Sequence, residues 1–269
     1  MTVPIQTAIT ELVPGDIRIR GYSLDELMGN ISYTEAVYLC IKGELPSKAV
    51  SKMLEALMMA ITDHSLWGAA TPSARIVCGG NPDPLHGICA GILSIGPVTG
   101  SPRHSAHFVQ NAYSLMVEQK ISQEEAADRI IENCLANKER IPGFGHPLFK
   151  LPSEPDIRAR RLREIAEQNG FVGPKVKLYE CIHSRYLNKI GKHSLVINVD
   201  GMMGAIMSEM DFDDDMIDII GVLSYLPGIC AHTYEELKAR SSIGLVAAIN
   251  EGVTYSGPVA RKLPKDRVK

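Results

Sequence analysis

Apolar residues recur at every third and fourth position through much of the chain, which is the spacing of one face of an α-helix. One such stripe runs from Val50 to Ile61, and another runs from Val176 to Ile190. A third follows Ser122-Gln-Glu-Glu125, where the serine and the glutamate have the spacing of a capping box. We therefore expect long helices at all three places.

The remaining pattern adds a fourth helix and little β-structure. Asp213 to Asp215 fit a helix N-terminus ahead of Met216–Leu223, because carboxylates oppose the positive end of the helix dipole. Only Ser194–Val199 is β-like, and it is too short to carry a sheet. We predict an all-α protein whose function resides in the loops between helices. Glycine and proline mark the main ones at residues 79–84, 96–102, 141–147 and 152–155.

Composition and charge exclude several classes of protein. The 269 residues are 45% hydrophobic and 22% charged, as in an ordinary globular protein, and the formal charge of −3 gives no field to hold nucleic acid or an anionic membrane. Apolar runs such as Gly87–Pro97 are shorter than the roughly 18 residues of a membrane span, and the first residues do not resemble a signal peptide. Six scattered cysteines without a CxxC pair argue against disulfide or zinc frameworks. We expect a cytoplasmic protein without metal.

The loop Pro142-Gly143-Phe144-Gly145-His146 is the first candidate for chemistry. Its glycines let the backbone turn tightly around a ligand, although His146 on its own also fits a structural histidine. Several basic residues follow this loop within a few helical turns. They form either a solvated helix face or a site for carboxylates and phosphates, which arginine binds with two parallel hydrogen bonds. The basic residues concerned are Lys150, Arg158, Arg160, Arg161 and Arg163.

Asp200 and His64 are two further candidate functional residues. Asp200 ends an apolar run and opens the apolar stretch Met202–Ile206, so it is either a helix N-cap or a carboxylate in a dry pocket, and the two are compatible. Apolar walls raise the basicity of such a carboxylate toward that of a proton acceptor. His64 follows the first long helix, where Asp63 can orient it, although a helix C-terminus also favours histidine in general.

The order of these motifs resembles that of the citrate synthase superfamily and, within it, the citryl-CoA lyase branch, which includes the C-terminal lyase module of ATP-citrate lyase. The pairing of Gly-Phe-Gly-His with Asn-Val-Asp is the specific part of the resemblance. The matching stretches are collinear and cover most of the chain: RIRGYSLDEL (18–27), the ITDH that ends in His64, SARIVCGGNPDPLHGICAGILSIGP (73–97), IPGFGHPLFK (141–150), PDIR (155–158), LVINVDGMMGAIM (195–207) and PGICAHTYEEL (227–237).

This resemblance implies a role for each matching residue. His64 and His146 match histidines that bind the oxaloacetate–citrate skeleton, Asp200 matches the catalytic carboxylate at the α-carbon of the acetyl thioester, and Arg158 matches an arginine that clamps a substrate carboxylate. Lys150 matches a basic residue for the phosphates of coenzyme A, and Phe144, Gly145 and Arg161 are expected to contact coenzyme A as well.

The resemblance also implies the architecture. The family fold is an all-α dimer whose large domain carries a smaller inserted helical domain, with the active site in the cleft between them. Here the large domain is expected over residues 1–104 and 211–269 and the small domain over 105–210.

Two positions depart from the family pattern. Thr99 stands where synthases carry the histidine that donates to the thioester carbonyl, and the lyase branch often lacks that histidine too. A shift in register would let His104 or His107 act instead. Tyr225 stands where an arginine is usual, so one ligand for a substrate carboxylate is missing and a 2-oxoacid with a single carboxylate is expected to be preferred. Both positions are still counted as substrate-binding candidates.

The expected function is cleavage of a 3-hydroxy-3-carboxyacyl-CoA, such as citryl-CoA, into an acyl-CoA and a 2-oxoacid. No cofactor is expected to be bound permanently, since the coenzyme A thioester is the substrate. A homodimer or higher homo-oligomer is expected, without nucleic acid or membrane as partner. Two alternatives stay open: a citrate-synthase-type acyltransferase working in the condensing direction, and a catalytically silent homologue that binds CoA esters.

Overall fold

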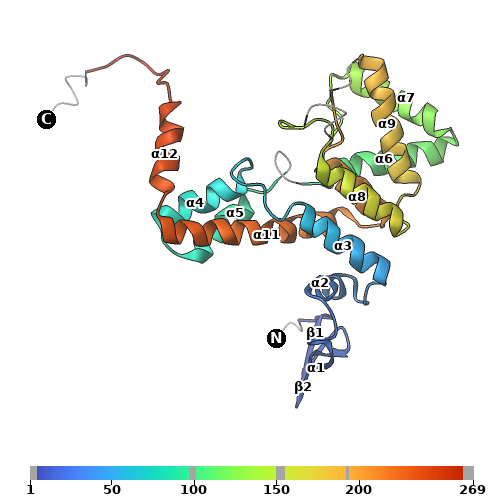
Figure 1. Cartoon of the computed structure of the whole chain (residues 1–269), viewed down its shortest axis with the longest axis horizontal. Coiled ribbons are helices and arrows are strands. Elements are labelled where there is room, and N and C mark those ends of the chain that lie inside the picture. Colours follow the sequence, from blue (N-terminus) through green and yellow to red (C-terminus); the bar gives the residue numbers. More distant parts are fainter. Residues whose placement is uncertain (1–4, 97–100, 150–154, 192–193, 263–269) are drawn as a thin grey trace. The chain divides into compact units, whose positions relative to one another are not determined.

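Helices make up most of the molecule, as the apolar spacing predicts (Figure 1). The computed structural model describes residues 5–96, 101–149, 155–191 and 194–262. The helices are α1 (Leu24–Leu27), α2 (Tyr33–Lys42), α3 (Lys48–Ala60), α4 (Ala70–Gly80), α5 (Pro84–Leu93), α6 (Arg103–Gln119), α7 (Gln123–Ala136), α8 (Ile157–Gln168), α9 (Pro174–Ile190), α10 (Val199–Glu209), α11 (Asp214–Ala239) and α12 (Ser242–Glu251). The predicted helical class is confirmed.

A small antiparallel sheet near the N-terminus was not predicted. It joins β1 (Thr10–Val13), β2 (Asp16–Ile19) and β3 (Tyr22–Ser23) in that order. Gly15 and Gly21 make the two turns with positive φ angles of 83° and 91°, which glycine adopts without steric cost. The strands lie mostly on the surface, so they lack the apolar alternation that signals a half-buried strand.

Side chains define the predicted helix starts. The Ser122 hydroxyl accepts the Glu125 N–H at 3.1 Å, but the Glu125 carboxylate pairs with Arg129 at 2.6 Å. The expected capping box is therefore only half formed, because the glutamate takes an i,i+4 ion pair instead. At α11, Asp213 accepts the Met216 N–H at 2.8 Å, which confirms the N-terminus predicted there.

Residues 1–68 and 95–228 pack as one compact unit with α10 at its centre. Every residue from Gly201 to Ser208 is buried, as expected for a helix that is apolar on all sides. Gly204 lets α6 approach closely, since a Cβ there would lie 2.6 Å from the Ala106 nitrogen. Helices α8 and α9 cover other sides of α10. This packing gives α10 a fixed position, and α10 carries Asp200.

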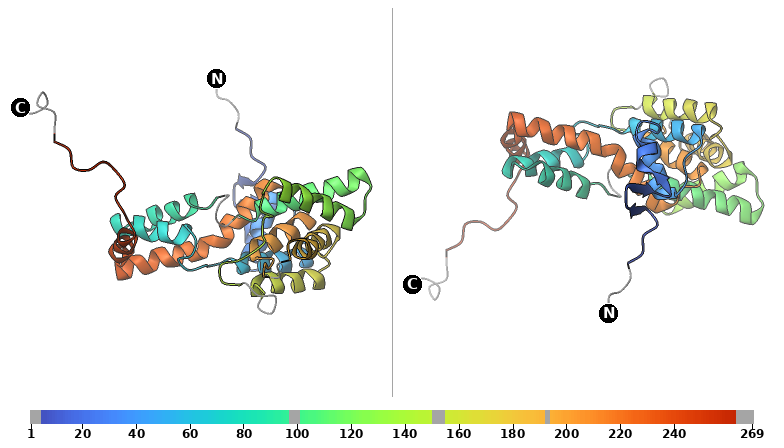
Figure 2. Two further views of the ribbon diagram at one scale, coloured as in Figure 1. Left: turned by 90° about the horizontal axis from the view of Figure 1, so that it is seen from above. Right: turned by 90° about the horizontal axis from the view of Figure 1, so that it is seen from below.

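Residues 69–94 and 229–269 form the second compact unit. Figure 2 shows its helices α4 and α5 side by side. A Cβ at Gly91 would lie 2.6 Å from the Ile229 side chain, so α5 and the C-terminal part of α11 pack in close contact. Several large apolar side chains of this unit are exposed to solvent, among them Leu85 (68%), Leu93 (85%) and Ile249 (54%).

Helix α11 is long and apolar enough to cross a membrane by length and composition alone. A core helix meets the same criterion, and 44% of its apolar window is buried within the chain.

The division into a large domain (1–104 and 211–269) and a small domain (105–210) remains a prediction.

Candidate active site

The loop that carries His146 is pressed onto the start of α10. Gly143 has a φ angle of 79°, and a Cβ at Gly143 or at Gly201 would collide with the hydroxyl of Tyr179 and with the other glycine. The Asn198 N–H donates to the Gly143 carbonyl at 2.9 Å, and the Asn198 side chain donates to the Gly145 carbonyl at 2.9 Å. The two glycines therefore allow the contact that joins the motif around His146 to the motif around Asp200.

The segment 194–199, predicted as β-like, forms a single antiparallel bridge between Ile197 and Phe144. Asn198 then caps α10, because its side-chain oxygen accepts the Gly201 N–H at 3.0 Å. The expectation that Asp200 is the N-cap is wrong, since Asn198 comes two residues earlier and has the required side chain. Asp200 lies in the first turn of α10 instead.

Asp200 is half-buried and its Oδ1 is inaccessible to solvent, which agrees in part with the second interpretation, a carboxylate in a dry pocket. Burial raises the pKa of Asp200, the positive charge of Arg158 lowers it, and the negative charge of Asp156 raises it further. The Oδ1 atom is buried without a hydrogen-bond partner among the described residues. A partly buried carboxylate with a raised pKa can both accept and deliver a proton.

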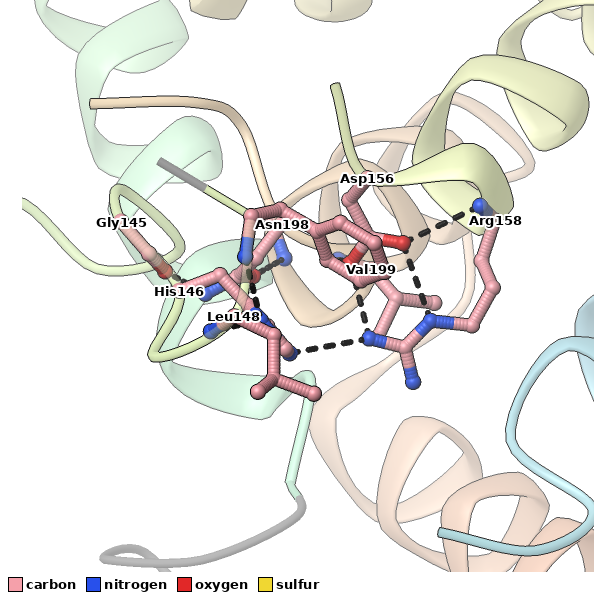
Figure 3. Close-up of polar contacts among 9 residues, drawn as sticks. Gly145, His146, Leu148, Asp156, Arg158, Asn198 and Val199 are labelled. Atoms are coloured by element: carbon pink, nitrogen blue, oxygen red, sulfur yellow. Dashed lines mark hydrogen bonds and ion pairs between the residues drawn. The ribbon is translucent and has the colours of Figure 1, made fainter. Parts of the chain in front are cut away.

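Both ring nitrogens of His146 have hydrogen-bonding neighbours. Its Nδ1 accepts the backbone N–H of Leu148 at 3.1 Å and that of Phe149 at 3.3 Å, which favours a neutral ring with its proton on Nε2 (Figure 3). Burial lowers the pKa of His146, although the nearby Asp156 raises it, and this favours the neutral ring. The Nε2 atom lies 3.2 Å from Nη2 of Arg158. Arginine can only donate, so the pair is a hydrogen bond when Nε2 is unprotonated, and with the proton on Nε2 it presents two donors to an oxygen atom of a ligand.

His64 lies beside His146, with ring centroids 5.9 Å apart. The segment that precedes it is fixed on α11, where the Gly228 N–H donates to the Thr62 carbonyl at 3.0 Å. A Cβ at Gly228 would collide with that carbonyl, which explains the need for glycine there. Burial and the positive charge of Arg158 lower the pKa of His64.

Arg158 is held by a carboxylate to which the sequence reasoning gave no role. Asp156 is fully buried and accepts hydrogen bonds from Nε and Nη2 of Arg158 at 3.0 and 2.8 Å (Figure 3). Its Oδ2 also accepts the Val199 N–H at 3.0 Å. The signal available in the sequence was an acidic residue two positions before the arginine in PDIR.

The other arginines of α8 pair with glutamates. Arg160 and Arg161 both contact Glu164, and Arg163 contacts Glu167 and Glu180. Of the two interpretations of this basic stretch, the solvated face holds for Arg160 and Arg161, which are exposed. A role of Arg161 in binding coenzyme A remains a prediction.

The structure places the other predicted residues as follows. The Phe144 ring packs against the rings of Tyr179, His183 and Tyr186, and the contacts of Phe144 and Gly145 with coenzyme A remain predictions. Thr99 and Lys150 lie outside the described residues.

Tyr225 is brought to the site by α11. It is partly buried against the main core, and burial together with the negative charge of Asp200 raises its pKa, which Arg158 opposes. The aromatic ring therefore lies within electrostatic range of both groups, although its role in substrate binding stays a prediction.

His104 and His107 line a pocket of about 630 Å³ that also contains Arg103, Asp214 and Asp218. His107 faces Asp214 at 3.7 Å, and Arg103 pairs with Asp218 at 2.6 Å. Whether either histidine replaces the one missing at Thr99 remains a prediction. Among the described residues, no group of three or more His, Cys, Asp or Glu side chains is arranged to hold a metal ion.

Comparison with known proteins agrees with this geometry. Residues 46–244 match the family model of the citrate synthase C-terminal domain. The chain belongs to the citrate synthase family. Its fold matches a citryl-CoA lyase from Hydrogenobacter thermophilus with a TM-score of 0.84 and 34% identity, covering 97% of this chain and 98% of that one.

Curated relatives are longer than this chain. It is 26% identical to the citrate synthase of Synechocystis over 72% of its own length and 47% of that protein. It is also 26% identical to citrate synthase 2 of Bacillus subtilis over 97% of its own length and 66% of that protein. The chain thus spans about half to two thirds of these synthases and nearly all of the lyase.

Proposed function

We propose that this protein is a citryl-CoA-lyase-like enzyme. It cleaves the C–C bond of a 3-hydroxy-3-carboxyacyl-CoA reversibly, with citryl-CoA giving acetyl-CoA and oxaloacetate as the first candidate reaction. The observation that carries the proposal is the convergence of Asp200, His146, His64 and Arg158 in one place. The match in length to a citryl-CoA lyase supports the cleaving direction.

Cleavage begins at the substrate hydroxyl group. Neutral His64 accepts its proton as the carbonyl of the 2-oxoacid forms, and the bond to the α-carbon of the thioester breaks. The neutral Nε2–H of His146 donates to the substrate oxygen and stabilises it as its charge changes. The lowered pKa of His64 keeps its ring neutral before the reaction and favours return of the accepted proton to solvent afterwards.

Asp200 completes the reaction at the other fragment. Breaking the bond leaves its electron pair on the thioester as an enol or enolate. Protonated Asp200 delivers a proton to the α-carbon, which gives the acyl-CoA and leaves the carboxylate ionised. In the condensing direction the same carboxylate removes that proton.

Arg158 provides the cation for a substrate carboxylate. Nη2 of Arg158 and Nε2 of His146, two donors 3.2 Å apart, suit oxygen atoms of a 2-oxoacid placed beside them. Tyr225 adds an aromatic wall where a second arginine is usual in the family. We therefore infer a 2-oxoacid with fewer negative charges than oxaloacetate as the preferred product.

Condensation is the second candidate function, because the similar curated proteins are named citrate synthases. A catalytically silent relative is less consistent with an intact set of Asp200, His146 and Arg158. We also propose a cytoplasmic homodimer that binds coenzyme A only as part of its substrate.

The two directions are separated by one set of assays. The purified chain is given citryl-CoA, and oxaloacetate is followed by coupling to malate dehydrogenase. In parallel it is given acetyl-CoA with a panel of 2-oxoacids, and thiol release is followed. Cleavage faster than condensation supports the lyase, thiol release alone supports the synthase, and neither reaction at any substrate overturns the proposal.

A further inference from the structure

Asp156 is a buried carboxylate that connects two parts of the site. It caps the N-terminus of α8, where its Oδ1 accepts the Arg158 N–H at 3.0 Å. The same carboxylate binds the guanidinium of Arg158 side-on and accepts the Val199 N–H at the start of α10 (Figure 3). One side chain with no exposed surface thus touches both the substrate-side cation and the helix that carries Asp200.

We propose that Asp156 is a positioning residue that holds Arg158 and the first turn of α10 in a single fixed arrangement for the reaction. The inference rests on the proposed function and deepens it, because it assigns a role to a residue that need not touch the substrate.

The contacts explain how such positioning works. The side-on bond uses Nε and one proton of Nη2, and Nη2 also lies 3.2 Å from Nε2 of His146, which leaves Nη1 of Arg158 for a ligand. Val199 immediately precedes Asp200, so the bond to its N–H fixes the start of the turn from which Asp200 projects. A shift of about 1 Å in either group is enough to cost about a hundredfold in rate.

The negative charge of Asp156 has a second effect on the site. It neutralises the positive charge of Arg158, which would otherwise be free to pair with the Asp200 carboxylate, whose Oδ1 has no hydrogen-bond partner among the described residues. The negative charge of Asp156 also raises the pKa of Asp200, while Arg158 lowers it. The titratable groups that face this pair come from four other segments: His64 after α3, His146 in its loop, Asp200 on α10 and Tyr225 on α11.

The test variant is Asp156→Asn, which keeps the shape and the helix cap but places an NH₂ group against donors. Its matched control is Asp128→Asn, since Asp128 binds Arg185 side-on through both oxygens and joins α7 to α9. We expect Asp156→Asn to lower kcat/KM for cleavage about 10- to 100-fold. We also expect the basic limb of its cleavage profile, where Asp200 loses the proton that it delivers, to move to lower pH, because Arg158 then stabilises ionised Asp200. Asp128→Asn should match wild type within about twofold.

A merely structural role predicts a different result, in which stability falls but KM and the pH limb stay unchanged. Binding of oxaloacetate, measured by calorimetry, is a readout without turnover, and Asp156→Asn should weaken it at least about tenfold. If Asp156→Asn does not fold, Asp156→Glu retains the charge and should show a lower kcat with the wild-type pH limb.

The outcomes separate the inference from the proposed function. The inference alone is overturned if the wild type is active and the kcat/KM of Asp156→Asn lies within twofold of it, like that of the control. It is also overturned if Asp156→Glu has the wild-type kcat. A wild type that neither cleaves citryl-CoA nor binds oxaloacetate overturns both.

Discussion

Replacing Asp200 by asparagine separates catalysis from folding more cleanly than any other change in the site. Asn198, not Asp200, caps α10, so the helix start survives the substitution. Asparagine has nearly the same shape but cannot accept or deliver the proton at the α-carbon. We expect turnover to collapse while the fold remains intact.

The structure sets the size of the effect. A positioned acid or base contributes about 10²- to 10⁴-fold, or about 2.7 to 5.4 kcal/mol of barrier. Asp156 is the other carboxylate whose charge acts on Asp200, but it is bonded to Arg158 and Val199. Burial raises the pKa of Asp156, but these bonds and the charge of Arg158 outweigh burial and lower it overall. Because Asp156 cannot replace the lost group, the loss should lie near the upper end of the range.

Stability should respond in the opposite direction. The pKa of folded Asp200 is raised, so its contribution to stability is present below the unfolded pKa and is lost as pH rises through the folded pKa. At neutral pH an ionised Asp200 therefore destabilises the fold, and Asp200→Asn should melt at the same temperature as wild type or higher.

The assay is oxaloacetate release from citryl-CoA, with thermal unfolding followed by circular dichroism on the same samples. A variant that keeps more than about a tenth of the wild-type rate would refute the assignment of the base. A large drop in melting temperature would refute the account of its burial.

Four further predictions follow. Tyr225→Arg should raise kcat/KM for oxaloacetate relative to pyruvate, measured by condensation with acetyl-CoA, because the added fork pairs the second carboxylate; a wild type that already favours oxaloacetate more than about tenfold, or 1.4 kcal/mol, contradicts this. Gly201→Ala should lower the unfolding free energy in urea by about 1–3 kcal/mol, because a Cβ meets Tyr179 and Gly143; an unchanged midpoint speaks against that packing. The rate of condensation, in which Asp200 is the base, should fall with decreasing pH at pH values above the ordinary range of an aspartate, because the Asp200 pKa is raised; condensation that persists down to that range excludes Asp200 as the titrating base. Light scattering should give twice the chain mass of 29.4 kDa, and a stable monomer at micromolar concentration would rule out the dimer.

Local sequence signals predicted the helices well. The stripes from Val50 to Ile61 and from Val176 to Ile190 correspond to α3 and α9, because an apolar face at helical spacing is a strong and local signal. The sheet of β1 to β3 was not predicted because its strands are short and mostly exposed, with polar residues such as Glu11 and Arg18 at facing positions.

The sequence motifs single out candidate site residues but do not predict the contacts between them. The positions of His146 and Asp200 in their motifs pointed to chemistry, and the helix cap was misassigned because Asn198 and Asp200 both have capping side chains. The role of Asp156 depends on a backbone N–H 43 positions away in the chain. The tautomer of His146 depends on two backbone groups of its own loop. Neither the role of Asp156 nor the tautomer of His146 can be read from residue type or spacing.

The most direct test of the central claim is cleavage of citryl-CoA by the wild-type protein in D₂O, with products identified by mass spectrometry. The account predicts oxaloacetate together with acetyl-CoA that carries one solvent deuterium in its methyl group, delivered through Asp200. Asp200→Asn should leave citryl-CoA almost untouched over the same time. Free coenzyme A with citrate would instead mean thioester hydrolysis and would contradict C–C bond cleavage, as would a wild type that leaves citryl-CoA unchanged.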